Sequence, residues 1–134
     1  MSKRRIKLLV VDDVQSIREF VQYYFKERGY VVLMAASAEE ALPIIKEEYP
    51  DIMLLDMNLT GMSGLELLKL VRQFNTEIKV IMLSGSNIDF KSDPRFKELN
   101  ILDFIHKPSG LTELELAVEK AIKHLKTRRQ DGIP

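Results

Sequence analysis

Short apolar runs that alternate with longer segments of helical periodicity constrain the fold of this chain most. Five runs of five or six residues predict strands, over Ile6–Val11, Tyr30–Met34, Asp51–Leu55, Ile78–Leu83 and Ile101–His106. Most are nearly continuous in apolar residues, as expected for strands that helices cover on both faces. Because strands that alternate with helices pair in parallel, the pattern predicts an α/β fold: a doubly wound, five-stranded parallel sheet with helices on both faces.

Helix signals fill the segments between these runs. In the first segment, apolar side chains recur at steps of three and four residues, at Ile17, Phe20, Val21, Tyr24 and Phe25. Gly29 supplies a helix stop. We expect the aromatic side chains of this helix to pack in the core rather than to form a cofactor platform.

The second helix opens with a capping box, in which the Ser37 hydroxyl and the Glu40 carboxylate each bond a backbone N–H. Pro43 lies inside this helix and predicts a kink. Asp93 before Pro94 predicts a short fourth helix over Pro94–Leu99. Apolar spacing marks the third and last helices: Leu65, Leu68, Val71 and Phe74, then Leu114, Ala117, Val118, Ala121, Ile122 and Leu125.

Composition narrows the class of protein. With no cysteine there is neither a disulfide framework nor a zinc-thiolate site. No apolar run approaches the roughly 18 residues of a membrane span, and we expect no signal peptide. The 134 residues fit one domain over 1–127 with a short tail over 128–134.

The formal net charge of zero hides an uneven distribution. Residues 8–118 hold 11 basic and 18 acidic side chains, a net charge of −7, between basic ends. Basic ends can suggest nucleic acid, but no dense basic stripe with interleaved aromatic residues accompanies them. Solvated helix ends are the better interpretation, and the acidic body raises the question of what its carboxylates bind.

Polar residues follow four of the five predicted strands. Asp12 and Asp13 follow the first strand, Asp56 the third, Ser84-Gly85-Ser86 the fourth and Lys107-Pro108 the fifth. Each pattern alone is common in turns and helix caps. Because the carboxyl ends of parallel strands meet at one edge of a sheet, where ligands bind, together they predict a site with three carboxylates, a hydroxyl and an ammonium.

The chemistry of this set points to phosphoryl transfer. Two carboxylates about 4 Å apart repel by roughly 4 kcal/mol at an effective dielectric near 20, so a cluster of three calls for a cation or a shared proton. Oxygen donors suit a hard ion such as Mg²⁺. With cations to neutralise phosphoryl oxygens, a carboxylate can attack phosphorus, and the product would be an acyl phosphate on Asp56.

These residues, in this order and spacing, resemble the response-regulator receiver domain of two-component signalling over about residues 6–126. The resemblance implies a flavodoxin-like strand order 2-1-3-4-5 and Asp56 as the phosphoacceptor. It also implies that Asp13, Asp56 and the backbone carbonyl of Asn58 ligate Mg²⁺, and that Asp12 assists through water. Lys107 would pair with the phosphoryl group, and its bond to Pro108 resembles the cis peptide of the family.

The resemblance further implies a switch. Ser84 takes the place of the hydroxyl that bonds the phosphoryl group, and Phe104 takes the place of the switch aromatic, often a tyrosine. Asn58 and Ser86 lie where the family tunes hydrolysis. Gly61 stands where the family often has proline, so we expect a more mobile loop there. The long loop from Ser84 to Ser92 and the short fourth helix alter the usual signalling surface.

The function implied is a cytoplasmic signalling switch rather than an enzyme. Its phosphoryl donor would be a histidine kinase or a phosphotransfer protein, and its output a contact with an unknown downstream protein, without direct binding of nucleic acid or membrane. One alternative is a receiver-like interaction or dimerisation module that needs no phosphate. A second is a phosphatase with an aspartyl nucleophile, but that class has a second acid two residues after the nucleophile, where this chain has Asn58.

Overall fold

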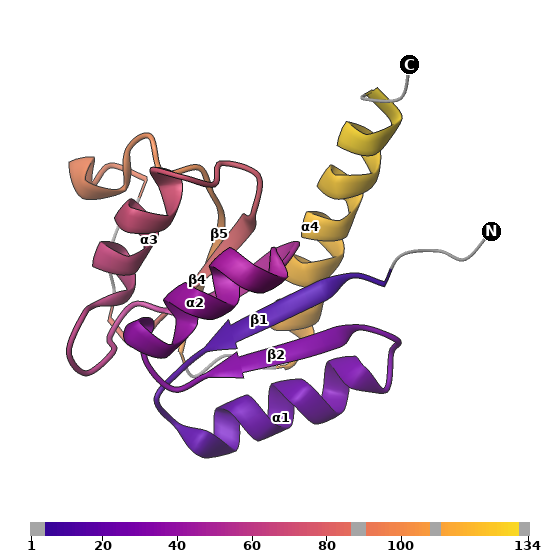
Figure 1. The fold of residues 1–134 in the computed structure, drawn as a ribbon, viewed down its shortest axis with the longest axis horizontal. Coiled ribbons are helices and arrows are strands. Elements are labelled where there is room, and N and C mark those ends of the chain that lie inside the picture. The colour runs from indigo at the N-terminus through magenta and orange to yellow at the C-terminus, as the bar shows by residue number, and fades with distance from the viewer. Residues whose placement is uncertain (1–4, 87–90, 108–110, 132–134) are drawn as a thin grey trace.

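The computed structural model describes residues 5–86, 91–107 and 111–131 (Figure 1). Five strands form one parallel sheet in the order β2-β1-β3-β4-β5, as the sequence and the resemblance predicted. The strands are β1 (Lys7–Val11), β2 (Val31–Ala35), β3 (Ile52–Asp56), β4 (Lys79–Ser84) and β5 (Ile101–His106). The helices are α1 (Gln15–Lys26), α2 (Ala38–Glu48), α3 (Gly64–Arg72) and α4 (Leu111–Asp131), with a 3₁₀ turn, η1 (Pro94–Phe96).

Burial along the strands follows their place in the sheet. The central strands β1, β3 and β4 are buried from their second residue onward, whereas β2 and β5, at the edges, are partly exposed. The predicted range of β5 is confirmed, and the ranges of the other strands begin or end one residue later than predicted.

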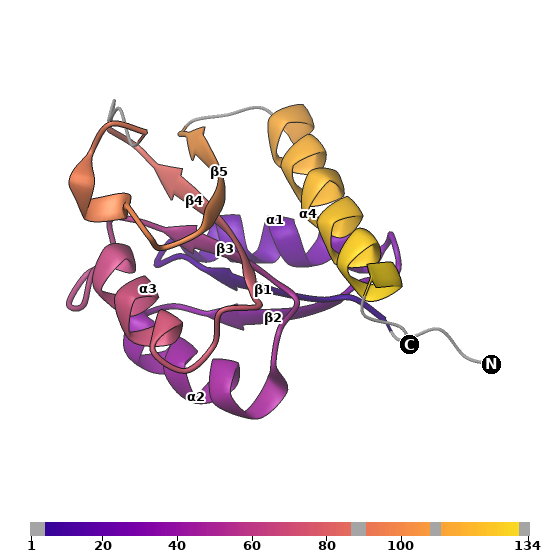
Figure 2. The same ribbon diagram turned by 90° about the horizontal axis from the view of Figure 1, so that it is seen from above.

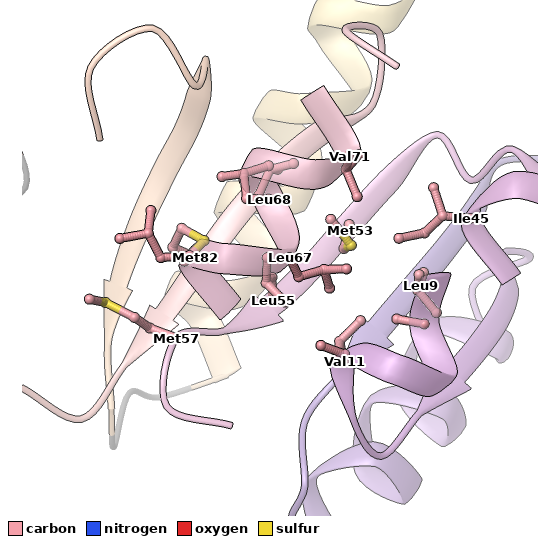
Figure 3. Packing of buried hydrophobic residues seen from close by; sticks show 14 of the residues in the cluster. Leu9, Val11, Ile45, Met53, Leu55, Met57, Leu67, Leu68, Val71 and Met82 are labelled. Carbon is pink, nitrogen blue, oxygen red and sulfur yellow. The ribbon is translucent and has the colours of Figure 1, made fainter. Parts of the chain in front are cut away.

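Helices cover both faces of the sheet and enclose two apolar clusters. One lies between the sheet and the helices α2 and α3, and Figure 3 shows its side chains, among them Leu9, Met53 and Leu67. The other lies between the opposite face and the helices α1 and α4, and includes Leu54 and Val118. Figure 2 shows these helix pairs on opposite sides of the sheet. The alternation of side chains along each strand divides the apolar residues between the two clusters.

The first helix ends as predicted, but its aromatic face is only partly buried. Gly29 adopts φ +93° after the last turn of α1, and the N–H of Tyr30 bonds the carbonyl of Phe25. Phe25 lies in the core, whereas Phe20 is 50% exposed. The prediction that Phe20 packs in the core is therefore wrong, because the buried stripe of α1 passes through Val21 and Phe25.

The capping box at the start of α2 is confirmed. The Ser37 hydroxyl accepts a hydrogen bond from the N–H of Glu40, and the Glu40 carboxylate accepts one from the N–H of Ala36. The helix continues across Pro43 to Glu48. The third helix is shorter than its apolar spacing predicted. It ends at Arg72, so Phe74 lies outside it and is 47% exposed instead of packing in the core.

The predicted fourth helix is wrong in extent. Asp93 caps the N–H of Arg95 as expected, but η1 ends at Phe96 and the backbone of Lys97 is extended. Glu98 and Asn100 then adopt φ +67° and +53°. Left-handed residues cannot continue a right-handed helix, so the segment after β4 forms one turn where a helix over Pro94–Leu99 was expected.

The last helix is longer than predicted. It runs to Asp131, into the segment 128–134 that was expected to be a tail. In the described part of the chain, no helix combines the length and the apolar character that crossing a membrane requires.

Candidate functional site

Three aspartates meet at the carboxyl edge of the sheet. Asp12 and Asp13 follow β1, and Asp56 ends β3, the strand paired beside it. One carboxylate oxygen from each lies within 4.8 Å of the others. This aspartate cluster joins Asp56 to two side chains that lie 43 and 44 residues earlier in the sequence. The parallel pairing of β1 and β3 brings them together.

Backbone donors fix the two buried members of the aspartate cluster. Asp12 is fully buried, and its Oδ1 accepts a hydrogen bond of 2.9 Å from the N–H of Val14. Asp56 is 4% exposed, and its Oδ1 accepts a hydrogen bond of 3.0 Å from the N–H of Asn58. In both residues Oδ2 therefore remains directed to other partners.

The Lys107 ammonium contacts the Oδ2 atoms of both Asp12 and Asp56. Its Nζ lies 2.6 Å from Asp12 Oδ2 and 3.3 Å from Asp56 Oδ2. Burial of the Lys107 ammonium lowers its pKa, but the hydrogen bond and charge of Asp12, with the charge of Asp56, outweigh burial and hold the pKa of Lys107 above its ordinary value. Lys107 therefore stays positively charged at neutral pH.

The third member, Asp13, faces solvent. It is exposed, and its Oδ2 accepts a hydrogen bond of 3.3 Å from the Thr60 hydroxyl. The three carboxylates of the aspartate cluster thus outnumber the single ammonium that bonds them. The donors are carboxylate oxygens with one exposed side, which suits a hard divalent cation such as Mg²⁺ that keeps several waters.

The predicted switch residues lie outside the aspartate cluster. Ser84 is buried at the end of β4, where its hydroxyl bonds the N–H of Ser86 at 3.1 Å within its own loop. The N–H of Lys107 bonds the carbonyl of Ser84, so this loop is joined to the lysine. Phe104 packs edge-on against Phe96 of η1, with ring centroids 5.7 Å apart. Pro108, and with it the predicted cis peptide, lies outside the described residues.

Three residues that sequence reasoning missed support the site. The Arg18 guanidinium on α1 donates to the backbone carbonyl of Asp12 at 2.7 Å. Thr60 bonds Asp13, as described above. A Cβ on Gly64 would lie 2.2 Å from the carbonyl oxygen of Asp56, so only glycine lets α3 approach the end of β3 this closely. A glycine directly after a helix-capping serine was a usable signal, whereas the other two contacts depend on tertiary approach.

Comparisons with known proteins agree with this geometry. A family model described as the response regulator receiver domain matches residues 8–119. Sporulation initiation phosphotransferase F of Bacillus subtilis strain 168 is 36% identical over 115 residues, which cover 85% of this chain and 91% of that protein.

Two further similar proteins differ in how much of their own length the match covers. The alkaline phosphatase synthesis transcriptional regulatory protein PhoP of the same strain is 33% identical over 117 residues, 87% of this chain but only 48% of PhoP. The crystal structure of a CheY-like response regulator receiver domain protein from Methanospirillum hungatei JF-1 is 28% identical, with a TM-score of 0.83, and the match covers 96% of this chain and 100% of that one.

Proposed function

Because this chain belongs to the response regulator receiver domain family, we propose that it is a phosphorylation-controlled switch whose phosphoacceptor is Asp56. The donor would be a histidine kinase or a phosphotransfer protein in a cytoplasmic signalling pathway. The observation that carries the proposal is the placement of Asp56, nearly buried at the end of a central strand, 3.3 Å from the Lys107 ammonium and beside two further carboxylates.

The reaction uses Oδ2 of Asp56, the oxygen beside the Lys107 ammonium. Its carboxylate attacks the phosphorus of a phosphohistidine, an O–P bond forms, and the P–N bond breaks with its electron pair passing to the imidazole nitrogen. The product is an acyl phosphate on Asp56. The hydrogen bond from the N–H of Asn58 to Oδ1 orients the carboxylate, and the Lys107 ammonium stabilises the negative charge that gathers on the phosphoryl oxygens.

The aspartate cluster also suits the divalent cation that such chemistry uses. Asp13, Asp56 and the backbone carbonyl of Asn58 would hold Mg²⁺ directly, and Asp12 would act through water. When bound, Mg²⁺ supplies positive charge that neutralises phosphoryl oxygens. The excess of negative charge left after Lys107 is counted supports this assignment.

The output is a change in a contact with a downstream protein. Ser84 would leave its bond to the N–H of Ser86 and turn to the phosphoryl group, and Phe104 would move with it as part of a two-state equilibrium. Asn58 and Ser86, exposed beside the site, would set the rate at which water removes the phosphoryl group. Residues 1–127 form the receiver domain in this proposal.

Intact-mass spectrometry after incubation with acetyl phosphate tests the proposal. With Mg²⁺ the wild-type chain gains the mass of one phosphoryl group, and the gain is lost in Asp56→Asn and in wild type treated with a chelator. Asp103→Asn is the matched control, because Asp103 lies on β5 outside the aspartate cluster, and it is labelled like wild type. Equal labelling of wild type and Asp56→Asn would refute the assignment of the phosphoacceptor.

A further inference from the structure

One member of the aspartate cluster, Asp13, has no backbone donor among the described residues. Asp12 and Asp56 are buried, and each bonds a backbone N–H with one carboxylate oxygen and the Lys107 ammonium with the other. Asp13 is exposed, and within the described residues the Thr60 hydroxyl is the one hydrogen-bond donor to its carboxylate, 3.3 Å from Oδ2. The orientation of the Asp13 carboxylate thus depends on Thr60.

Thr60 belongs to the loop between β3 and α3, residues 57–63, and this loop is held on both sides of it. Before it, Leu59 is 8% exposed and packs in the apolar cluster under α2 and α3. After it, the N–H of Met62 donates to the carboxylate of Glu39 on α2 at 3.4 Å. Gly61 adopts φ +84° close to the same carboxylate. The Thr60 hydroxyl is therefore presented from an anchored backbone.

A hydrogen bond to a carboxylate also affects how that carboxylate binds a cation. An ionised carboxylate offers about four lone pairs, so Asp13 can accept from Thr60 and still ligate a metal ion. A side chain that is already held in one orientation loses less conformational entropy when it binds. Mg²⁺ gains most from such a ligand, because it demands near-ideal octahedral geometry. Partners that orient metal ligands commonly change the affinity of a site by about 10–100-fold.

We propose that Thr60 is a positioning residue for cation binding at the aspartate cluster, and that its hydroxyl orients the Asp13 carboxylate for Mg²⁺. The inference rests on the proposed function and adds to it a residue that sets how much Mg²⁺ phosphorylation requires. Thr60 contacts neither the cation nor the phosphoryl group and acts through Asp13. Removal of its hydroxyl therefore weakens the binding of Mg²⁺, and excess Mg²⁺ compensates for the loss.

Calorimetric titration of the full chain with Mg²⁺ at fixed ionic strength tests this role. Thr60→Val keeps the shape of the side chain without its hydroxyl, and we expect its dissociation constant for Mg²⁺ to rise about tenfold. Thr60→Ser keeps the hydroxyl and should bind Mg²⁺ almost as tightly as wild type. Thr76→Val is the matched control, because Thr76 is exposed between α3 and β4, at the opposite edge of the sheet. It should bind Mg²⁺ like wild type.

Two further measurements separate orientation of Asp13 from a general structural role of Thr60. Labelling with acetyl phosphate over a series of Mg²⁺ concentrations should require more Mg²⁺ in Thr60→Val than in wild type. Urea denaturation in the presence of a chelator should give the same midpoint for both, because substitutions at exposed positions rarely change stability. Lower stability of metal-free Thr60→Val would indicate a distorted loop and would overturn the proposed role.

The remaining outcomes separate this inference from the proposed function. Equal Mg²⁺ affinity of Thr60→Val and wild type, weak binding by Thr60→Ser, or an equal loss in Thr76→Val overturns the role of Thr60. If wild type is labelled by acetyl phosphate but binds no Mg²⁺, the role of Thr60 also fails, whereas Asp56 can still be the phosphoacceptor. If wild type is not labelled at all, the proposed function fails and the role of Thr60 with it.

Discussion

Gly64 lets the first turn of α3 lie against the backbone of Asp56. Its N–H bonds the carbonyl of Met57, and a Cβ there would lie 2.2 Å from the carbonyl oxygen of Asp56 and 2.9 Å from the Cα of Met57. Because these are backbone atoms, no change of side-chain rotamer can relieve the clash. Gly64→Ala should therefore lower the free energy of unfolding by about 1–3 kcal/mol, the usual effect of overpacking, and slow the labelling of Asp56. Urea denaturation and timed mass spectra measure the two effects.

Gly85→Ala is the matched control for stability. A Cβ at Gly85 meets nothing within 4 Å, so its unfolding free energy should stay within about 0.5 kcal/mol of wild type. If Gly64→Ala is as stable as Gly85→Ala, α3 does not set the position of Asp56.

At the scale of single residues, the sequence predicted which chemical groups meet but not how they are held. Asp12, Asp56 and Lys107 follow strands, and parallel pairing brings strand ends together whatever the intervening loops do. The contacts of Arg18 and Thr60 depend on how a helix and a loop approach those ends. No spacing rule encodes that approach, so both residues escaped prediction.

Among the elements, one side chain of α3 bonds the connection from η1 to β5. The half-buried guanidinium of Arg72 donates to the carbonyls of Leu99 at 2.8 Å, Asn100 at 3.2 Å and Asn75 at 3.3 Å. Burial lowers the pKa of Arg72 from its ordinary value, but the group remains charged. Arg72→Met leaves these carbonyls without their donor, and we expect a loss of about 1–3 kcal/mol in unfolding free energy with faster proteolysis between η1 and β5.

Arg95→Met is the control variant for Arg72→Met. Arg95 is exposed and paired with Asp93 on the surface, where an ion pair contributes about 0–1 kcal/mol. In limited proteolysis and urea denaturation, Arg72→Met should therefore be cleaved faster and unfold more easily than Arg95→Met. Indistinguishable variants would mean that the connection is held by Phe96 and Leu99 in the core rather than by Arg72.

Helices and strands were predicted best where burial requires a continuous run of apolar residues. The strands were correct to within one residue, because side chains covered on both faces must be apolar along the whole strand. Helix extent was harder. Glu98 carries no signal for its left-handed backbone, whereas Asn100 is a residue type that adopts this conformation readily and was a usable signal. Phe20 was misplaced for a related reason, since helical spacing does not show how wide the buried stripe is.

For the molecule as a whole, binding of Mg²⁺ at the aspartate cluster, as proposed above, would add to stability. A ligand that binds only the folded state stabilises it, by about 1.4 kcal/mol at a free concentration about ten times its dissociation constant. We therefore expect Mg²⁺ to raise the midpoint of thermal unfolding and a chelator to reverse the gain. In Asp13→Asn, which removes one negative charge from the cluster, the gain should largely disappear.

Asp103→Asn, at matched ionic strength, shows whether the effect belongs to the site. It should respond to Mg²⁺ like wild type, because Asp103 is not part of the aspartate cluster. An equal gain in Asp13→Asn would assign the stabilisation to general screening of the acidic surface. Differential scanning fluorimetry over a series of Mg²⁺ concentrations distinguishes the two cases.

The strand order also separates the buried centre of the sheet from its partly exposed edge. Asp56 ends β3, which is buried along its whole length between two apolar clusters, whereas β5 lies at the rim of the same sheet and is partly exposed. Substitutions at the rim can change the charge and shape offered to a partner without disturbing the strand that carries Asp56. Under the proposed function, surface mutation at this rim would therefore bring new partners while the acceptance of a phosphoryl group by Asp56 stays unchanged.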